Sequence, residues 1–265
     1  MKEKLRTLLL IVFVVIFLYA AWQLIAALKV YHQGQSSYDA LEQYISFETT
    51  ESEKAPAESP PSAASPLPDV SAWPQVDFDA LSQVNPDIVG WIFIEGTNIN
   101  YPVVQTTDND YYLDHLFDGT QNRSGSIFLD FRCSPDFSDR HSIIYGHHMK
   151  DKSMFQNLVS YKEQSFYDEH PEALLVTPDA YHRIRLFSGY ITDNWSSAWN
   201  ISFEDNTNFA IWLSDIQGKS SFTPTDTPTA ENTIITLSTC TYEFSDAKFV
   251  VHGYISETIE KAQFE

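Results

Sequence analysis

The chain has few cysteines and few positive charges. Its 265 residues include only two cysteines, Cys133 and Cys240, which excludes a framework of several disulfide bridges. The 16 Lys and Arg are outnumbered by 36 Asp and Glu, and the net charge of −20 argues against nucleic-acid binding, because phosphate recognition needs a basic surface. The same charge argues against binding to the general surface of an anionic membrane. No spacing of Cys, His or acidic residues is typical of a zinc or calcium site, so we predict no metal and no cofactor.

The N-terminus carries a nearly uncharged apolar run over residues 7–28. A helix of about 20 apolar residues crosses the hydrocarbon core of a bilayer, whereas the core of a cleaved signal peptide usually has about 7–15 residues. Lys2, Lys4 and Arg6 precede the run, which favours a cytoplasmic N-terminus by the positive-inside rule. Residues 1–29 are therefore predicted to form a cytoplasmic tip and one transmembrane signal-anchor in the cell membrane, with the rest of the chain extracellular. A cleaved signal peptide is the alternative.

A spacer is predicted between the membrane and the folded part of the chain. Residues 49–74 are rich in Pro, Ser, Ala and Glu, a composition that does not build a hydrophobic core and favours an extended stalk. We therefore assign residues 30–74 to a linker and residues 75–265 to the folded domain that carries the site described below.

Short apolar and β-branched runs follow, separated by Gly, Asn, Asp and Pro, and they predict strands. The predicted strands are residues 88–94, 99–104, 126–129, 142–145, 173–176, 181–191, 232–237 and 249–255. Short helices are expected near residues 76–81 and 153–160. Many short strands with few helices indicate a mainly β fold, a barrel or sandwich with peripheral helices.

One longer helix is predicted from Ser202 to about residue 216. Its apolar residues repeat at the helical spacing i, i+3, i+4 and i+7 and should form one buried stripe, namely Phe209, Trp212, Leu213 and Ile216. Ser202 is the expected N-cap, with Asp205 favourable in the first turn.

A cysteine stands at the end of the β-branched run over residues 234–240. Such a run is typical of a buried strand that delivers its last side chain to the mouth of a sheet. Cys240 is then a candidate nucleophile, provided that a histidine lies nearby in space. The alternative is a small buried hydrophobic residue, which is what most free cysteines are. A Cys133–Cys240 disulfide, which would block the nucleophile, also stays open.

A reactive thiolate needs a neighbouring cation, and acyl transfer needs a donor for the oxyanion. The run over residues 142–145 is followed by Gly146, His147 and His148, and on an extended chain only one of these two histidines should face the site. Lys248 stands near the start of the strand that returns after a turn at residues 243–246, and is a candidate neighbour of Cys240. A structural histidine and a solvated lysine are the alternatives.

Together these segments resemble sortases, the membrane-anchored cysteine transpeptidases of Gram-positive bacteria, and most closely class B. The resemblance extends from about residue 76 to residue 255, and the helix over residues 202–216 fits a class B feature. The segments that carry it are residues 88–92, 99–105, 108–113, 125–130, 144–147, 154–155 and the pentapeptide 236–240. The resemblance implies an eight-stranded sortase-type β-barrel with peripheral helices, preceded by one transmembrane helix.

The resemblance also implies roles for single residues. Cys240 would be the nucleophile and His147 the general acid and base. Thr239, Ser142 and Tyr145 are expected to bind substrate or line its groove.

One position departs from the family pattern. The third catalytic residue of sortases is an arginine on the strand after the cysteine, and this chain has Lys248 there. Lysine carries one mobile ammonium where arginine carries a rigid, bidentate guanidinium, so we expect slower turnover or altered substrate positioning. Arg132 and Arg140 are candidates to compensate.

The implied reaction is transpeptidation. A sorting motif of the LPxTG or NPxTN kind in a secreted protein is cleaved after its threonine through a thioester acyl-enzyme. The protein is then transferred to an amine of a peptidoglycan precursor in the cell wall or, in pilus assembly, to a pilin amine. Two alternatives are a thiol hydrolase of the same fold, in which water replaces the amine, and a catalytically weakened, membrane-tethered binding protein.

Overall fold

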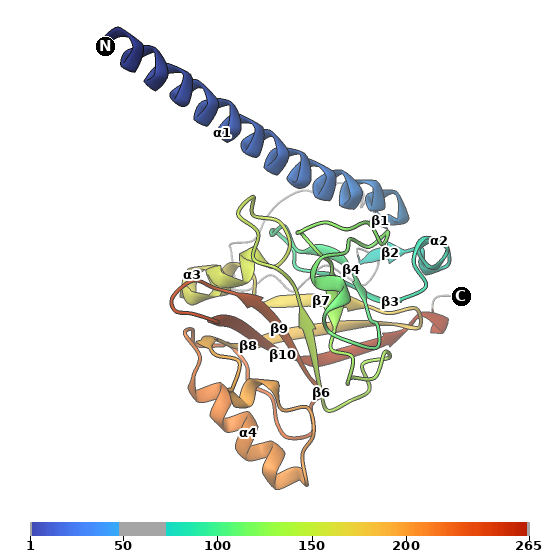
Figure 1. Cartoon of the computed structure of the whole chain (residues 1–265). Coiled ribbons are helices and arrows are strands. Elements are labelled where there is room, and N and C mark those ends of the chain that lie inside the picture. The colour runs from blue at the N-terminus through green and yellow to red at the C-terminus, as the bar shows by residue number, and fades with distance from the viewer. Residues whose placement is uncertain (1, 48–72, 264–265) are drawn as a thin grey trace, which may run out of the picture.

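The computed structural model describes residues 2–47 and 73–263, and its centre is a closed barrel of eight strands (Figure 1). Neighbouring strands follow the order β10-β8-β7-β3-β4-β5-β6-β9, and β9 closes the barrel against β10. The barrel strands are β3 (Ile88–Phe93), β4 (Asn100–Val104), β5 (Ile127–Leu129), β6 (His141–Tyr145), β7 (Glu172–Val176), β8 (Ala180–Thr192), β9 (Ile234–Cys240) and β10 (Lys248–Glu260). The predicted mainly β fold with an eight-stranded barrel is confirmed.

Each of the eight predicted runs is a barrel strand in the structure, and only the end of the last one differs much. β10 continues to Glu260, beyond the predicted end at residue 255, because β8 pairs with it as far as Ala180 opposite Glu260. Residues 256–258 of this extension are exposed and carry no apolar pattern. Only the partner strand therefore defines where β10 ends.

Helices and a small two-stranded sheet surround the barrel. They are α1 (Lys2–Asp39), η1 (Ala40–Tyr44), β1 (Ile45–Phe47), β2 (Pro74–Val76), α2 (Phe78–Val84), η3 (Tyr111–Leu113), η4 (Gln156–Lys162), α3 (Gln164–Glu169), η5 (Ser197–Trp199), α4 (Asn206–Gly218) and η6 (Lys261–Gln263), where η denotes a 3-10 helix. The helix expected near residues 153–160 is η4, and the one expected near residues 76–81 is α2, which begins and ends slightly later.

Helix α4 covers one outer face of the barrel. The four residues of its predicted stripe are buried, and they pack with Phe187, Ile234 and Val250 of β8, β9 and β10. The predicted N-cap is wrong: Asp205, not Ser202, caps the helix, and its carboxylate accepts a hydrogen bond of 2.8 Å from the backbone N–H of Asn208. A carboxylate is the stronger acceptor at this positive helix end, which explains the later start.

The interior of the barrel is a dry hydrophobic core. Inward-facing residues of different strands, among them Ile92, Leu129, Ile144, Leu175 and Leu237, are at most 1% exposed. Burying a side chain of this size contributes about 1.5–3 kcal/mol relative to leaving it in water. The barrel is therefore a rigid support for the loops at its ends.

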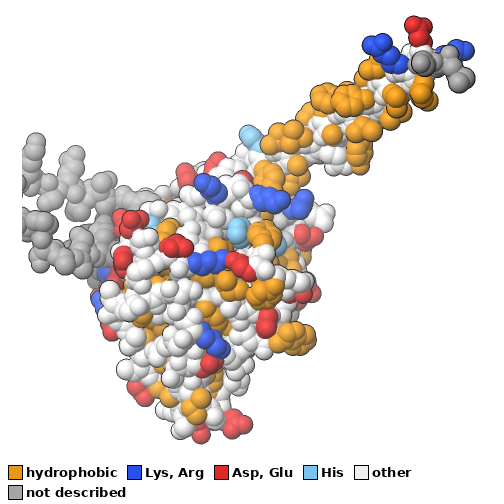
Figure 2. Space-filling view, turned by 90° about the vertical axis from the view of Figure 1, so that its left-hand side faces the viewer, with side chains coloured by type: hydrophobic (Ala, Val, Ile, Leu, Met, Phe, Trp, Pro, Cys, Tyr) orange, Lys and Arg blue, Asp and Glu red, His pale blue; other side chains and the backbone are white. Residues whose placement is uncertain are grey.

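Helix α1 extends from the barrel and is coated with apolar side chains along most of its length (Figure 2). It is the one helix among the described residues that is long and apolar enough to cross a membrane. Its 38 residues span about 57 Å, well beyond the roughly 30 Å of a hydrocarbon core. The last third of α1 therefore extends past the apolar run.

That last third packs against the barrel loops. The hydroxyl of Tyr38 donates to the Gly125 carbonyl at 2.7 Å, and the Asn122 side chain donates to the Val30 carbonyl at 3.0 Å. Gly34 permits the close approach, because a Cβ there would lie 2.8 Å from the Ser124 hydroxyl oxygen.

The predicted linker over residues 30–74 lies partly outside the described residues. Its described beginning, residues 30–47, is not extended: it completes α1, turns through η1 and pairs β1 with β2, with Ile45 opposite Val76. Residues 48–72 are not described, so the division into residues 1–29, 30–74 and 75–265 stays a prediction.

The strand crossing at Gly253 of β10 should be sensitive to one added methyl group. A Cβ there would lie 2.3 Å from Ile184 Cγ2 and 3.0 Å from Leu186 Cδ2, so we expect Gly253→Ala to lower the free energy of unfolding by about 1–3 kcal/mol in urea titrations. Gly218→Ala is the matched control, since nothing lies within 4 Å of its added Cβ and alanine favours the end of α4. Equal stability of the two variants would contradict the tight crossing.

Candidate active site

The parallel pairing of β6 and β9 places the candidate base beside the candidate nucleophile. Tyr145 of β6 is opposite Ser238 of β9, so two residues further along each strand direction His147 and Cys240 stand at the same edge of the barrel. The Gly146 N–H donates to the Ser238 carbonyl at 3.0 Å and prolongs the pairing. A Cβ on Gly146 would lie 2.4 Å from Ile127 Cδ1, so only glycine fits here.

The thiol of Cys240 contacts the ammonium of Lys248. Cys240 is the last residue of β9, Lys248 is the first of β10, and the two are directly opposite in the antiparallel pair. The distance from Lys248 Nζ to Cys240 Sγ is 3.1 Å, and both residues are partly exposed. A cation at this distance stabilises the thiolate, which is the reactive form of cysteine.

The two histidines of the same loop are held differently. His147 Nε2 lies 2.6 Å from the Leu113 carbonyl oxygen. A carbonyl only accepts, so Nε2 carries the proton and Nδ1 of the neutral ring is left free to accept one. His148 turns its Nδ1 to the Cys240 carbonyl oxygen at 2.9 Å, which fixes the backbone of the nucleophile.

These residues surround one open cavity of about 430 Å³, here called the Cys240 cavity. Its lining comes from β5, β6, β9, β10 and the loops around them. The lining residues are Asn109, Leu113, Phe128, Arg132, Tyr145, Gly146, His147, Asn194, Trp199, Ser238, Thr239, Cys240 and Lys248. The cavity combines a thiol, an imidazole and an ammonium with apolar walls, as a site for an extended peptide requires.

The structure brings together all but one of the residues singled out from the sequence. Cys240, His147, Lys248, Tyr145 and Thr239 line the cavity. The exception is Ser142, which is fully buried in the wall of the barrel and is not among the lining residues. The prediction that Ser142 binds substrate is wrong, because alternation along β6 turns its side chain, like that of Ile144, toward the core.

Arg132 supplies a second cation to the cavity, whereas Arg140 does not reach it. Both oxygens of the buried Asp130 carboxylate accept hydrogen bonds from the Arg132 guanidinium, at 2.9 and 2.8 Å, and Tyr145 donates to the same carboxylate at 2.9 Å. Burial raises the pKa of Asp130, but these hydrogen bonds outweigh it and hold that pKa below its ordinary value. Arg140 instead contacts Asn206 and the Phe209 ring near α4.

Sequence reasoning assigned no role to several lining residues. Asn109 and Leu113 lie in a matched segment, and Asn194 and Trp199 lie in the loop before α4. Asn109 uses its side-chain oxygen to accept the Phe131 N–H at 3.0 Å. A polar side chain next to aromatic residues was the available signal, but loop positions do not reveal which face meets the cavity.

The turn after Cys240 is tied to the barrel. Lys162 of η4 forms an ion pair with Glu243, and Glu243 also accepts a hydrogen bond from the Thr241 hydroxyl. These bonds from Lys162 and Thr241 lower the pKa of the Glu243 carboxyl to about 2. The turn that positions Lys248 against Cys240 is therefore braced from outside the strand pair.

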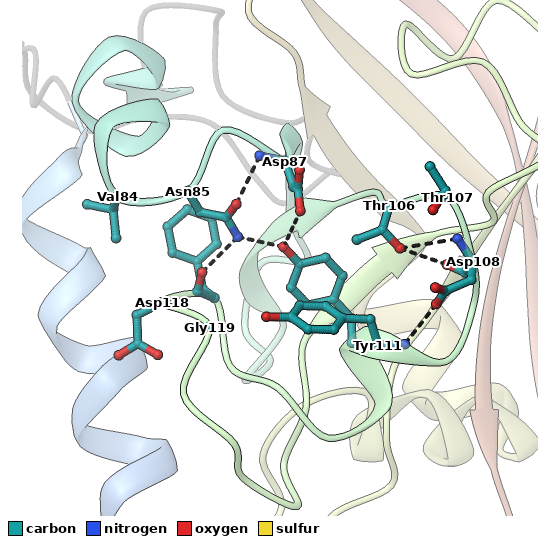
Figure 3. Close-up of a pocket in the computed structure, with 11 residues that line it drawn as sticks. Val84, Asn85, Asp87, Thr106, Thr107, Asp108, Tyr111, Asp118 and Gly119 are labelled. Carbon is teal, nitrogen blue, oxygen red and sulfur yellow. Dashed lines mark hydrogen bonds between the residues drawn. The ribbon is translucent and has the colours of Figure 1, made fainter.

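A second hollow of about 370 Å³ lies on the other side of the segment that carries Asn109 and Leu113 (Figure 3). The Asn85 side chain donates to the Tyr112 hydroxyl at 2.7 Å, and that hydroxyl donates to Asp87 at 2.9 Å. These bonds brace the wall of the Cys240 cavity from behind. Within the described ranges no group of three or more His, Cys, Asp and Glu side chains is placed to hold a metal ion.

A buried chain of hydrogen bonds runs across four strands beneath the site. Tyr190 OH donates to His252 Nε2, His252 Nδ1 to Thr236 Oγ1, Thr236 to His141 Nε2, and His141 Nδ1 to the Asn200 carbonyl, at 3.2, 2.7, 2.6 and 2.6 Å. This direction satisfies every group only if both rings are neutral. Burial lowers the pKa of His141 to about 4 and that of His252 well below its ordinary value.

The closed barrel with a thiol, an imidazole and an ammonium at one edge defines a cysteine transpeptidase of the sortase type. Known proteins agree with this class. Sortase B of Listeria monocytogenes is 36% identical over 175 residues, which are 65% of this chain and 71% of that protein. The chain belongs to the sortase B family. No protein-family model matches it.

Solved structures give the same result. Sortase B from Bacillus anthracis in complex with AAEK1 has a TM-score of 0.70 and 31% identity, covering 86% of this chain and 98% of that one. The Staphylococcus aureus sortase B-substrate complex has a TM-score of 0.64 and 34% identity, covering 69% and 85%. The expected class B fold and the enzyme class are confirmed.

The two cysteines should differ sharply in reactivity. Both are free thiols, but Cys133 is buried, which raises its pKa to about 11, whereas Cys240 faces the cavity beside Lys248. At pH 7 we expect iodoacetamide to modify Cys240 and spare Cys133, with Lys248→Met slowing the reaction of Cys240 about tenfold and Lys248→Arg preserving it. Mass spectrometry of the labelled peptides measures both rates. A Lys248→Met variant labelled at the parent rate would contradict the contact.

The buried histidine chain should make the fold sensitive to mild acid. A histidine whose folded pKa is depressed contributes stability above its unfolded pKa near 6.5, and this is lost as the pH falls toward the folded value near 4. We expect the free energy of unfolding to fall by about 1.4 kcal/mol per pH unit in that window for His141 alone. His141→Gln should flatten this slope and His32→Gln, at an exposed residue of α1, should leave it. Urea titrations between pH 4.5 and 7 measure it, and equal slopes for the two variants would contradict the argument.

Proposed function

We propose that the chain is a membrane-anchored transpeptidase that cleaves a sorting motif of the LPxTG or NPxTN kind after its threonine. The observation that carries the proposal is the 3.1 Å contact between Lys248 and the Cys240 thiol, in a cavity shared with His147. α1 crosses the cell membrane once, with its N-terminus in the cytoplasm and the barrel outside, which the apolar run after Lys4 and Arg6 supports.

The first half-reaction makes a thioester. The Cys240 thiolate, stabilised by the Lys248 ammonium, attacks the threonine carbonyl carbon, and Lys248 donates a hydrogen bond to the oxyanion. His147 gives a proton to the departing amine, and the C-terminal fragment leaves.

The second half-reaction transfers the protein. An amine attacks the thioester carbonyl, the Cys240 sulfur leaves as thiolate, and His147 accepts the proton of the attacking amine at its free Nδ1. The acceptor is an amine of a peptidoglycan precursor or of a pilin. A Staphylococcus aureus sortase B with bound substrate and a sortase B complexed with triglycine support a peptide on one side of the thiol and an amine on the other.

The walls of the cavity determine how the motif lies. Tyr145 is fixed by its bond to Asp130, and burial together with that carboxylate raises the pKa of Tyr145, so its hydroxyl stays neutral. The Arg132 side chain is 41% exposed and offers a fixed guanidinium to substrate carbonyls. Thr239 lines the cavity next to the thiol and has a buried hydroxyl oxygen with no partner in the described part of the chain.

Two peptides with and without an amine test the reaction. The full chain is incubated with an LPxTG and an NPxTN peptide, each with and without triglycine, and the products are resolved by mass spectrometry. We expect a covalent Cys240 adduct and, with triglycine, a transfer product, and Cys240→Ala should lose both by at least a hundredfold. Cleavage that yields only hydrolysed peptide indicates a thiol hydrolase, and binding without cleavage indicates a weakened binding protein.

Lys248 separates a slow transpeptidase from an inactive one. Lys248→Arg should increase acyl-enzyme formation several-fold, because the guanidinium adds a second donor while keeping the charge. Lys248→Met should decrease it by tenfold or more, and Lys219→Gln, far from the cavity on the end of α4, is the control. No gain in the arginine variant would contradict the proposed role of this position.

A further inference from the structure

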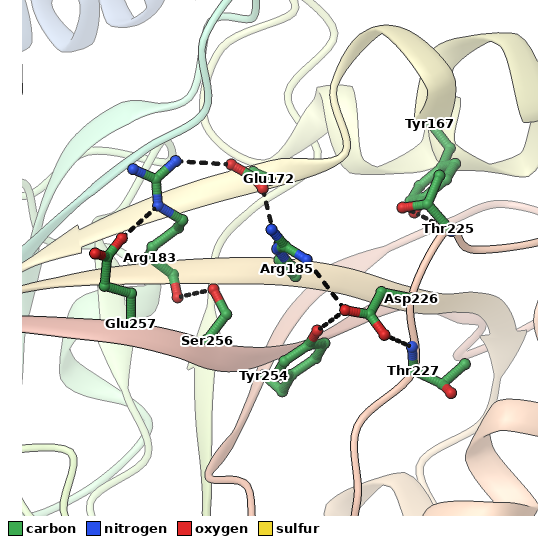
Figure 4. Close-up of polar contacts among 10 residues, drawn as sticks. All are labelled: Tyr167, Glu172, Arg183, Arg185, Thr225, Asp226, Thr227, Tyr254, Ser256 and Glu257. Carbon is green, nitrogen blue, oxygen red and sulfur yellow. Dashed lines mark hydrogen bonds and ion pairs between the residues drawn. The ribbon is translucent and has the colours of Figure 1, made fainter. Parts of the chain in front are cut away.

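Most cations of the barrel are neutralised within the fold. Figure 4 shows one chain of ion pairs across β7, β8 and β10, in which Arg183 contacts Glu172 and Glu257, and Arg185 contacts Glu172 and Asp226. The other ion-paired lysines and arginines are Arg132, Lys162 and Lys219.

Four exposed cations beyond the apolar run have no such partner. Among the residues that the structure describes, Lys29, Arg123, Lys150 and Lys152 form no ion pair, no side-chain hydrogen bond and no aromatic contact. We call these four residues the junction patch. The nearest carboxylate in sequence, Asp151, is occupied by the backbone N–H and hydroxyl of Ser153, at 3.1 and 2.6 Å.

The junction patch lies where α1 leaves its apolar run. Arg123 and Met149 line a small cavity of about 220 Å³ whose opposite wall is α1 between Gln23 and Tyr31. Lys150 and Lys152 follow Met149 directly, and Lys29 lies on α1 itself. Figure 2 shows lysine and arginine side chains gathered at the junction between the long helix and the globular body.

The docking of α1 keeps these loops at a fixed level along the helix. The bond from Asn122 to the Val30 carbonyl and the contact of Gly34 with Ser124 hold the loop that carries Arg123 against the helix. If residues 7–28 span the hydrocarbon core, then the helix positions beside this loop lie at the level of the lipid headgroups. The junction patch therefore faces a layer of phosphate groups.

We propose that the junction patch binds the phosphate groups of anionic phospholipids in the bilayer that α1 crosses. This inference rests on the proposed membrane anchoring. Cations without an internal partner are attracted by a negatively charged leaflet over roughly one Debye length, about 8 Å. The net charge of −20 does not prevent this, because acidic residues farther away are screened over the same distance.

The contact would set the height of the active site above the membrane. Lys150 and Lys152 stand in the loop that carries His147, whose ring lines the Cys240 cavity. Lipid bound to one side of this loop therefore holds the cavity on its other side close to the bilayer, where lipid-linked acceptors and newly exported proteins are found.

Amide hydrogen exchange in nanodiscs tests the proposal on the full chain. The discs contain phosphatidylcholine alone or mixed with phosphatidylglycerol. We expect residues 122–125 and 148–153 to exchange more slowly in the mixed discs at low salt, and the difference to disappear at high salt. Each neutralised cation should lower the docked-to-undocked ratio about fivefold, so Lys150→Gln weakens the slowing and Lys150→Gln with Lys152→Gln abolishes it.

Lys219→Gln is the matched control, because it removes one lysine on α4, at the opposite end of the barrel from α1 (Figure 1). It should exchange like the parent chain. Equal exchange in both kinds of disc, or an equal loss in Lys219→Gln and Lys150→Gln, overturns the proposal while α1 still retains the chain in the discs. A chain that α1 retains in neither kind of disc contradicts the membrane anchoring, and the junction patch with it.

Discussion

The parallel pairing of β6 with β9 is the constraint on which the active site depends. Parallel strands end at the same edge of a sheet, so the residues that follow each strand meet there. His147 and Cys240 are 93 positions apart in the chain and become neighbours only through this register. A slip by one residue would turn every side chain of β9 to the opposite face and move the thiol into the barrel wall.

The antiparallel partner of β9 completes the site with a different physical contribution. β10 begins directly opposite Cys240, and the Lys248 ammonium lies against the thiol without any carboxylate to compete for it. The bidentate geometry of an arginine is missing at this position. Arg132, held by Asp130, adds a fixed guanidinium to the same cavity, so the two donors that one arginine combines come here from two residues.

Neutral, buried groups stabilise the strands that carry these charges. The hydrogen-bond chain from Tyr190 to His141 crosses β8, β10, β9 and β6, which are the strands that hold Lys248, Cys240 and His147. Beyond the barrel, α1 is docked rather than tethered, because Gly34 and Tyr38 bring its last third into contact with the loops. The catalytic edge, the core beneath it and the helix above it are therefore coupled through direct contacts.

Much of this protein could be predicted from its sequence, because strand patterning and the residues around Cys240 are local features. The eight strands, the buried stripe of α4 and the positions of Cys240, His147 and Lys248 follow from periodicity and family resemblance. Ser142 was misplaced because the face of a strand residue depends on which side becomes the core. The pairing of Arg132 with Asp130, the docking of residues 30–47 and the unpaired cations beside α1 depend on contacts between segments distant in sequence, and only the tertiary structure decides those.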